Sequence, residues 1–133
     1  MSERVKVLVI EDQPEVLNLM LMILSRAGCE VAGAQTGTDG LRLAENGGFD
    51  LITLDVDLPE ANGFEICSRL KQDPQLRQTP VVFVSGRFAD EDVQRGREVG
   101  AADYITKPFD LFTFVSRLLS HVKVATAWRK LPA

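Results

Sequence analysis

Residues 51–63 read Leu-Ile-Thr-Leu-Asp-Val-Asp-Leu-Pro-Glu-Ala-Asn-Gly, which takes the chain from an apolar run directly into a turn. The run 51–54 is typical of a strand buried on both faces, and such strands belong to parallel sheets. Asp55 closes the run, and the turn residues that follow, among them Pro59 and Gly63, leave its carboxylate uncovered. An ionised aspartate at the end of a buried strand is a candidate nucleophile.

The chain on both sides of this stretch alternates strand patterns with helix patterns. Apolar runs predict strands at residues 5–10, 30–34, 51–54, 81–84 and 103–106. Apolar residues at helical spacing predict helices from Pro14 to Gly28, from Thr36 or Thr38 to Gly47, from Phe64 to before Pro74, over 90–99, and from Leu111 to about Val124. Parallel strands need crossover connections, so five strands and five helices predict a single α/β domain with an open, doubly wound parallel sheet.

Composition narrows the class of protein. The chain of 133 residues is 45% hydrophobic and 26% charged, which is typical of one soluble globular domain. A net charge of −4 argues against direct binding of nucleic acid or of a membrane surface. The apolar stretch 17–24 is too short to cross a bilayer, and the start has no signal-peptide pattern, so a cytoplasmic location is expected. Cys29 and Cys67 are interpreted as reduced thiols.

Chemically active side chains follow four of the predicted strands. They are Glu11 and Asp12, Asp55, Ser85, and Lys107 followed by Pro108. Open parallel sheets bind ligands beyond the carboxyl ends of their strands, so these groups are expected to share one site. If strands 5–10 and 51–54 are neighbours, the three carboxylates repel one another, and a divalent cation such as Mg²⁺ relieves that repulsion.

The charges of this set suit phosphoryl transfer. Glu11, Asp12 and Asp55 supply three negative charges, which Mg²⁺ and Lys107 balance. Asp55 needs no general base to attack a phosphoryl donor, since a carboxylate of ordinary pKa, about 4, is ionised at pH 7. The cation and Lys107 can neutralise the transferring oxygens, and the Ser85 hydroxyl can donate a hydrogen bond to one of them. The product is an aspartyl phosphate.

The ordered set Glu11-Asp12, Asp55-x-x-x-Pro59-x-x-x-Gly63, Ser85 and Lys107-Pro108 resembles the receiver domains of two-component response regulators. The resemblance covers residues 5–124. It implies a flavodoxin-like fold with strand order 2-1-3-4-5, a receiver domain over residues 1–124, and a tail or linker stub at 125–133.

The same resemblance implies a role for each matching residue. Asp55 is the expected phosphoacceptor, assisted by Lys107 and Ser85. The expected magnesium ligands are Asp12, Asp55 and the backbone carbonyl of Asp57, with Glu11 acting through a water. Ser85 and Tyr104 are the expected switch residues, and the peptide bond between Lys107 and Pro108 is expected to be cis.

The implied function is a phosphorylation-dependent switch in a two-component phosphorelay. A histidine kinase, a phosphotransfer protein or a small acyl phosphate supplies the phosphoryl group. The surface of the fourth helix, fifth strand and fifth helix then changes, which alters binding of a downstream effector or favours a phosphorylation-dependent homodimer. Such a domain is not an ordinary enzyme, although it assists its own phosphorylation and dephosphorylation.

Three residues need separate interpretation. Asp57 and Arg87, each two residues beyond a predicted site residue, are expected to approach each other across the site and to tune access of the hydrolytic water. The alternative is that they are two independently solvated charges. His121 is the only histidine, and it is interpreted as a surface or internally satisfied residue with no acidic neighbour.

Two other functions fit part of the pattern. Asp55-Val56-Asp57 matches the Asp-x-Asp motif of haloacid-dehalogenase-like phosphatases, although Pro59 and the early position of Glu11-Asp12 depart from that family. Steady hydrolysis of phosphate esters would favour this alternative, whereas a single stoichiometric phosphorylation would favour the switch. A receiver fold that acts only as a constitutive interaction module is the second alternative.

Overall fold

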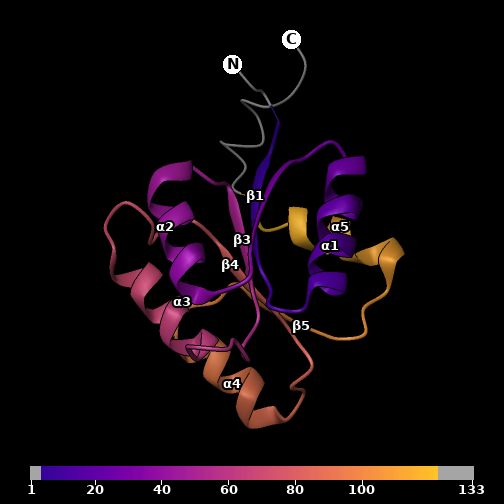
Figure 1. Ribbon diagram of the computed structural model, residues 1–133. Coiled ribbons are helices and arrows are strands. Elements are labelled where there is room, and N and C mark those ends of the chain that lie inside the picture. The colour runs from indigo at the N-terminus through magenta and orange to yellow at the C-terminus, as the bar shows by residue number, and fades with distance from the viewer. Residues whose placement is uncertain (1–3, 123–133) are drawn as a thin grey trace.

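Strands and helices alternate throughout residues 4–122, the part of the chain that the computed structural model describes (Figure 1). The strands are β1 (Lys6–Ile10), β2 (Glu30–Ala34), β3 (Leu51–Leu54), β4 (Val81–Ser85) and β5 (Asp103–Thr106). The helices are α1 (Pro14–Arg26), α2 (Gly37–Gly47), α3 (Gly63–Gln72), α4 (Asp90–Glu98) and α5 (Leu111–Leu119). All strand pairs are parallel, in the order β2-β1-β3-β4-β5, so the predicted fold class and strand order are confirmed.

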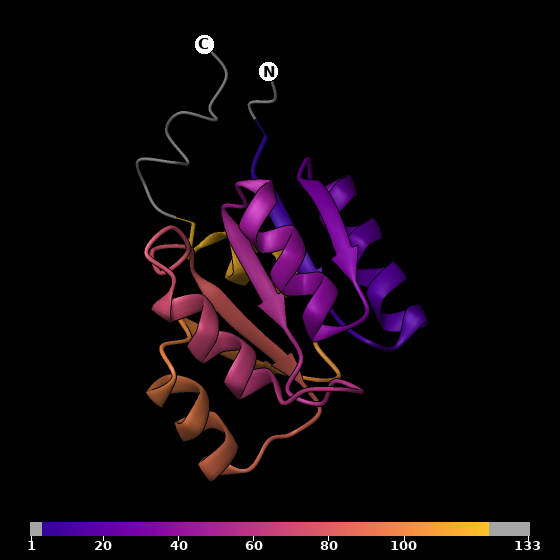
Figure 2. The same cartoon turned by 60° about the vertical axis from the view of Figure 1, so that its left-hand side comes forward.

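The sheet separates two hydrophobic cores, because successive side chains of a strand point to opposite faces. Val7 and Val9 of β1 pack with α1 and α5, whereas Leu8 and Ile10 pack with α2 and α3 on the other face. Figures 1 and 2 show α1 and α5 on one side of the sheet and α2, α3 and α4 on the other. Burial of both faces explains why the strand sequences are continuously apolar.

Local sequence signals explain where the helices begin. Pro14 occupies the first position of α1, where its missing N–H leaves no hydrogen bond unmade. The sequence left open whether Thr36 or Thr38 caps α2, and the hydroxyl of Thr36 accepts the hydrogen bond from the Asp39 N–H. Asn62 and Asp110 cap α3 and α5 in the same way. Within residues 4–122, no helix has the length and apolar character needed to span a membrane.

Helix α5 is shorter than predicted. It ends at Leu119, and the N–H groups of His121 and Val122 donate to carbonyls three residues earlier, those of Leu118 and Leu119. Such bonds mark a tightened last turn rather than continued α-helix. The predicted end was too late because Val122 continues the helical spacing of apolar residues and is buried, although it lies beyond the end of the helix. Val124 and the predicted boundary between domain and tail lie outside the described residues.

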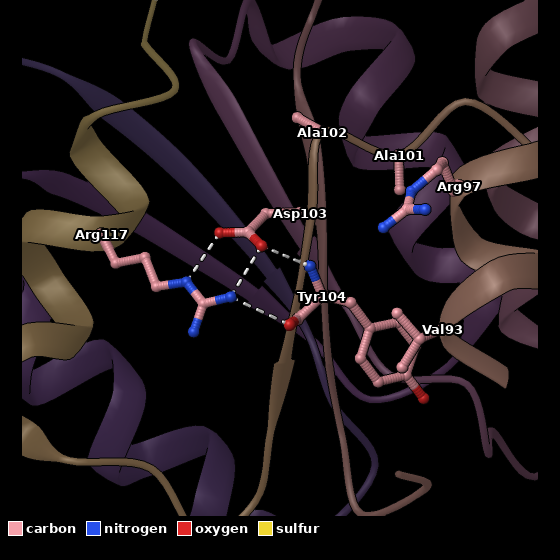
Figure 3. Close-up of a pocket in the computed structure, with 7 residues that line it drawn as sticks. All are labelled: Val93, Arg97, Ala101, Ala102, Asp103, Tyr104 and Arg117. Carbon is pink, nitrogen blue, oxygen red and sulfur yellow. Dashed lines mark hydrogen bonds and ion pairs between the residues drawn. The ribbon is translucent and has the colours of Figure 1, made fainter. Parts of the chain in front are cut away.

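A polar cluster fastens α5 to the edge strand β5. The guanidinium of Arg117 donates to both carboxylate oxygens of Asp103 at 2.8 Å and to the Tyr104 carbonyl at 3.2 Å (Figure 3). Nε2 of His121 lies 2.9 Å from the same Asp103 carboxylate. The expectation that His121 has no acidic neighbour is therefore wrong, because the fold brings together two residues that lie 18 positions apart.

Candidate functional site

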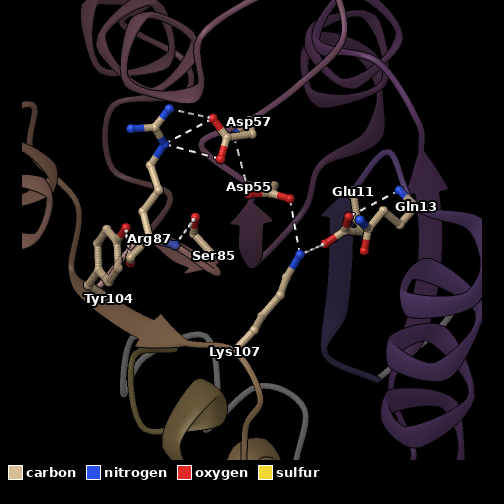
Figure 4. Close-up of polar contacts among 8 residues, drawn as sticks. All are labelled: Glu11, Gln13, Asp55, Asp57, Ser85, Arg87, Tyr104 and Lys107. Atoms are coloured by element: carbon tan, nitrogen blue, oxygen red, sulfur yellow. Dashed lines mark hydrogen bonds and ion pairs between the residues drawn. The ribbon is translucent and has the colours of Figure 1, made fainter. Parts of the chain in front are cut away.

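Strand register brings the predicted site residues to one edge of the sheet. Ile10 of β1 is paired with Leu54 of β3, so the residues that follow them, Glu11 and Asp55, are adjacent. The backbone N–H of Asp55 donates to the Ile10 carbonyl at 3.1 Å. On the other side of β3, Ser85 is paired with Thr106, and the N–H of Lys107 donates to the Ser85 carbonyl at 2.8 Å. Figure 4 shows these side chains converging from four strands.

Three carboxylates form the acidic part of the site. Glu11, Asp12 and Asp55 each offer one oxygen, and the three oxygens lie within 4.8 Å of one another. Glu11 is only 1% exposed and Asp55 only 5%, so water screens their repulsion poorly. Hard oxygen donors at this separation fit a magnesium ion. Asp12 and Asp55 border a cavity of about 250 Å³ that is also lined by Gln13, Asp57, Gly86 and Lys107.

Lys107 supplies the positive charge. Its Nζ lies 2.5 Å from Oε1 of Glu11 and 3.1 Å from Oδ2 of Asp55. Burial alone would lower the pKa of Lys107, but its bonds and attraction to the two carboxylates outweigh this and raise the pKa. Burial also raises the pKa of Glu11, which the hydrogen bond from Lys107 only partly offsets. The lysine is thus held protonated beside Asp55.

Backbone donors orient the two buried carboxylates. Oε2 of Glu11 accepts from the N–H of Gln13 at 3.1 Å, and Oδ1 of Asp55 accepts from the N–H of Asp57 at 3.2 Å. Asp55 therefore has one oxygen on the backbone and the other on Lys107. This arrangement holds its carboxylate at the mouth of the cavity.

Gly63 explains the spacing of the motif that follows Asp55. Its N–H donates to the Val56 carbonyl at 2.8 Å as α3 begins beside the end of β3. A Cβ at this position would lie 2.1 Å from the backbone oxygen of Asp55 and 2.8 Å from the Cα of Val56. Only a residue without a side chain allows this close approach.

Asp57, which lines the cavity, forms an ion pair with Arg87. Nε of Arg87 is 2.9 and 3.1 Å from the two carboxylate oxygens of Asp57, and Nη2 is 2.9 Å from Oδ1. Both side chains are at least half exposed. Hydrogen bonding to Asp57 raises the pKa of Arg87. Nη1 of Arg87 also lies 3.8 Å from Asp92, a tertiary contact that was not predicted from the sequence.

Ser85 and Tyr104 meet at the backbone of Arg87. The Ser85 hydroxyl, which is fully buried, accepts from the Arg87 N–H at 3.2 Å, and the Tyr104 hydroxyl donates to the Arg87 carbonyl at 2.7 Å. The tyrosine ring lies 5.8 Å from that of Phe83 and is 9% exposed. The ring of Tyr104, an expected switch residue, therefore lies inward in this structure.

The Lys107–Pro108 peptide bond is cis, as the family resemblance implied.

A family model described as the response regulator receiver domain matches residues 7–119 of this chain. The chain belongs to this family. It is therefore a receiver domain of the two-component response regulators, a signalling family in which an aspartate is phosphorylated and which is not a conventional enzyme family.

Other receiver-containing proteins agree with this assignment. The nisin biosynthesis regulatory protein NisR of Lactococcus lactis is 37% identical over 118 residues, which cover 89% of this chain and 50% of that protein. The regulator RpaA of Synechocystis, described as a DNA-binding dual master transcriptional regulator, is 36% identical, with 85% of this chain and 47% of that protein covered. This receiver domain thus spans about half the length of the curated relatives it matches.

Solved structures match the fold closely. The chemotaxis protein CheY4 of Vibrio cholerae superposes with a TM-score of 0.84 at 31% identity, covering 90% of this chain and 99% of that one. The BeF3-activated receiver domain of DrrB gives 0.80 at 31% identity, covering 89% and 97%. Membership of the receiver family decides against the haloacid-dehalogenase alternative for Asp55 and Asp57.

Proposed function

We propose that Asp55 is the residue on which this receiver domain is phosphorylated. The observation that carries the proposal is the position of its carboxylate, which is oriented by the Asp57 N–H, touches Lys107 and borders the open cavity. Attack by an Asp55 oxygen on phosphorus forms the new O–P bond as the bond between phosphorus and the donor breaks. Lys107, already protonated beside Asp55, is placed to neutralise charge on the transferring oxygens.

The proposed magnesium ligands are carboxylate oxygens of Asp12 and Asp55 and the backbone carbonyl of Asp57, with Glu11 acting through a water. The acidic cluster supports this assignment, since its oxygens lie within 4.8 Å of one another. When bound, Mg²⁺ would supply positive charge to the phosphoryl oxygens. Glu11 also holds Lys107 by an ion pair, so the chain's own cation stays close to the acceptor.

The proposed switch links Ser85 and Tyr104 through Arg87. A phosphoryl group on Asp55 offers new acceptors to the Ser85 hydroxyl, whose oxygen now accepts from the Arg87 N–H. Rotation of this hydroxyl breaks its hydrogen bond with the Arg87 N–H and shifts the Arg87 backbone, whose carbonyl accepts the hydrogen bond from Tyr104. The inward conformer of Tyr104 becomes more populated, and with it the corresponding surface of α4, β5 and α5.

We also propose the partners of this domain and the way in which its phosphorylation is reversed. A histidine kinase or phosphotransfer protein supplies the phosphoryl group, and a downstream effector, or a second phosphorylated copy, reads the surface of α4, β5 and α5. The description of RpaA as a DNA-binding transcriptional regulator supports an effector outside this domain. Dephosphorylation is assisted by the site itself, with Asp57 and Arg87 controlling access of water.

The test is labelling with acetyl phosphate in the presence of Mg²⁺, followed by location of the added mass. One phosphoryl group per chain on Asp55 is expected, with none in Asp55→Asn and none when Mg²⁺ is chelated. Ser116→Ala, which alters an exposed hydroxyl on α5, is a control that should label normally. Absence of labelling in a folded wild-type protein would contradict the proposal and favour a constitutive interaction module.

A further inference from the structure

We infer that Glu60 is a positioning residue for the magnesium-binding loop between β3 and α3. This β3–α3 loop, residues 55–62, includes Asp57, whose carbonyl is a proposed ligand. Glu60 ties the loop to the N-terminus of α2 and thereby fixes where that carbonyl lies. The inference rests on the proposed function, because it concerns the affinity of the same site for Mg²⁺.

The side chain of Glu60 makes three hydrogen bonds to the start of α2. Its Oε1 accepts from the N–H of Gly37 at 2.9 Å, and its Oε2 accepts from the N–H of Thr38 at 3.2 Å and from the Thr38 hydroxyl at 3.0 Å. The backbone bonds from Gly37 and then Thr38 lower the pKa of Glu60, so the carboxylate stays charged at neutral pH. Negative charge is favourable at a helix N-terminus.

These bonds do more than complete the helix, because α2 already has a local cap. The first N–H groups of a helix have no partner within it. Thr36 satisfies the N–H of Asp39 through its hydroxyl and that of Gly40 through its carbonyl. The N–H groups of Gly37 and Thr38 remain, and their partner comes from 23 and 22 residues away in the loop of the functional site.

Other contacts hold the loop at Asp57 itself, whose N–H donates to Asp55 and whose carboxylate pairs with Arg87. Asp57 and Asn62 form an isolated antiparallel bridge across the base of the loop, and Leu58 is buried in the core. A Cβ on Gly37 would lie 2.8 Å from Cδ1 of Ile66, so this glycine lets the start of α2 pack closely against α3, the helix that follows the loop. Glu60 lies at the exposed part of the loop and holds it by charged hydrogen bonds, which are stronger than neutral ones.

Metal affinity is sensitive to residues that orient the ligands. Loss of such a partner typically weakens binding by about tenfold or more. Calorimetric titration of Glu60→Ala with Mg²⁺ should therefore give a Kd raised about tenfold. Glu60→Gln should lie between this variant and the wild type, because its amide oxygen can accept from Gly37 but its NH₂ cannot accept from Thr38. At saturating Mg²⁺, the rate of labelling by acetyl phosphate should return close to that of the wild type.

Thr36→Ala is the matched control. It removes the local cap of the same helix and should lower the melting temperature, as loss of an N-cap does, while leaving the Kd for Mg²⁺ unchanged. An unchanged Kd in folded Glu60→Ala, or an equal rise in Thr36→Ala, would overturn the inference. A wild type that neither binds Mg²⁺ nor becomes labelled would instead overturn the proposed function.

Discussion

Arg87 touches the site through its backbone and through its side chain, and the two sets of contacts are separable. Its N–H and carbonyl bond to Ser85 and Tyr104, whereas its guanidinium bonds to Asp57 and approaches Asp92. Truncation of the side chain removes the ion pairs but keeps the backbone groups that join the proposed switch residues. Arg87→Ala therefore tests the mouth of the site alone.

We predict that Arg87→Ala and Asp57→Asn each shorten the lifetime of the aspartyl phosphate. The ion pair holds the side chain of Asp57, which lines the cavity, and we expect that releasing it admits the hydrolytic water. Because both side chains are at least half exposed, we expect a change of only about threefold in the rate of phosphoryl loss. The measurement is decay of isolated phosphorylated protein in Mg²⁺.

The double variant decides whether the two residues act together. If the ion pair is the barrier, Asp57→Asn combined with Arg87→Ala should lose phosphate no faster than either single variant. Effects that simply multiply would mean two independently solvated charges, the alternative raised from the sequence. Asp39→Asn, which breaks an exposed pair with Arg42, should leave the lifetime unchanged.

The start of α3 can lie against the end of β3 only because residue 63 is a glycine. Gly63→Ala would place a methyl group 2.1 Å from the backbone oxygen of Asp55, so the start of α3 has to move. We predict a loss of about 3 kcal/mol in the free energy of unfolding, measured by urea denaturation, because backbone cannot yield as a flexible side chain can.

Gly86→Ala is the control for that substitution. Apart from the residues next to it in the chain, no described heavy atom lies within 4 Å of a Cβ built on Gly86, although this glycine lines the cavity. Its unfolding free energy should stay within about 0.5 kcal/mol of the wild-type value. Equal stability of Gly63→Ala and Gly86→Ala would mean that the close approach of α3 to β3 does not constrain the sequence.

Helices were predictable because a single buried face imposes a helical period on the apolar residues, and strands because burial of both faces makes them continuously apolar. The same logic located Glu11, Asp55, Ser85 and Lys107, since parallel strands deliver their carboxyl ends to one edge. Strand order came from family resemblance, because apolar runs do not specify which strands are neighbours. The contacts of Glu60 with α2 and of Arg87 with Asp92 were missed, because exposed polar residues that meet through tertiary packing leave no periodic signal.

The last helix of the domain, α5, is attached to the edge strand β5. Asp103 of β5 is the charged group at this attachment. Hydrogen bonds from Arg117, and also from His121 and the Tyr104 N–H, hold the pKa of Asp103 well below its ordinary value of 3.8. A carboxyl group with a lower pKa in the folded state stabilises the fold above its unfolded pKa. That stabilisation is lost as the pH falls below 3.8 toward the folded pKa.

We predict that Asp103→Asn lowers the free energy of unfolding at pH 7 by about 1 kcal/mol, a modest loss because solvent screens the half-exposed Arg117. The difference from the wild type should shrink as the pH falls below 3.8 toward the folded pKa, since the wild-type carboxylate then loses its advantage. Urea unfolding at stepped pH measures this. Asp39→Asn, in the exposed pair with Arg42, should show a smaller difference. A difference for Asp103→Asn that stays constant with pH would mean that its charge does not stabilise the attachment of α5.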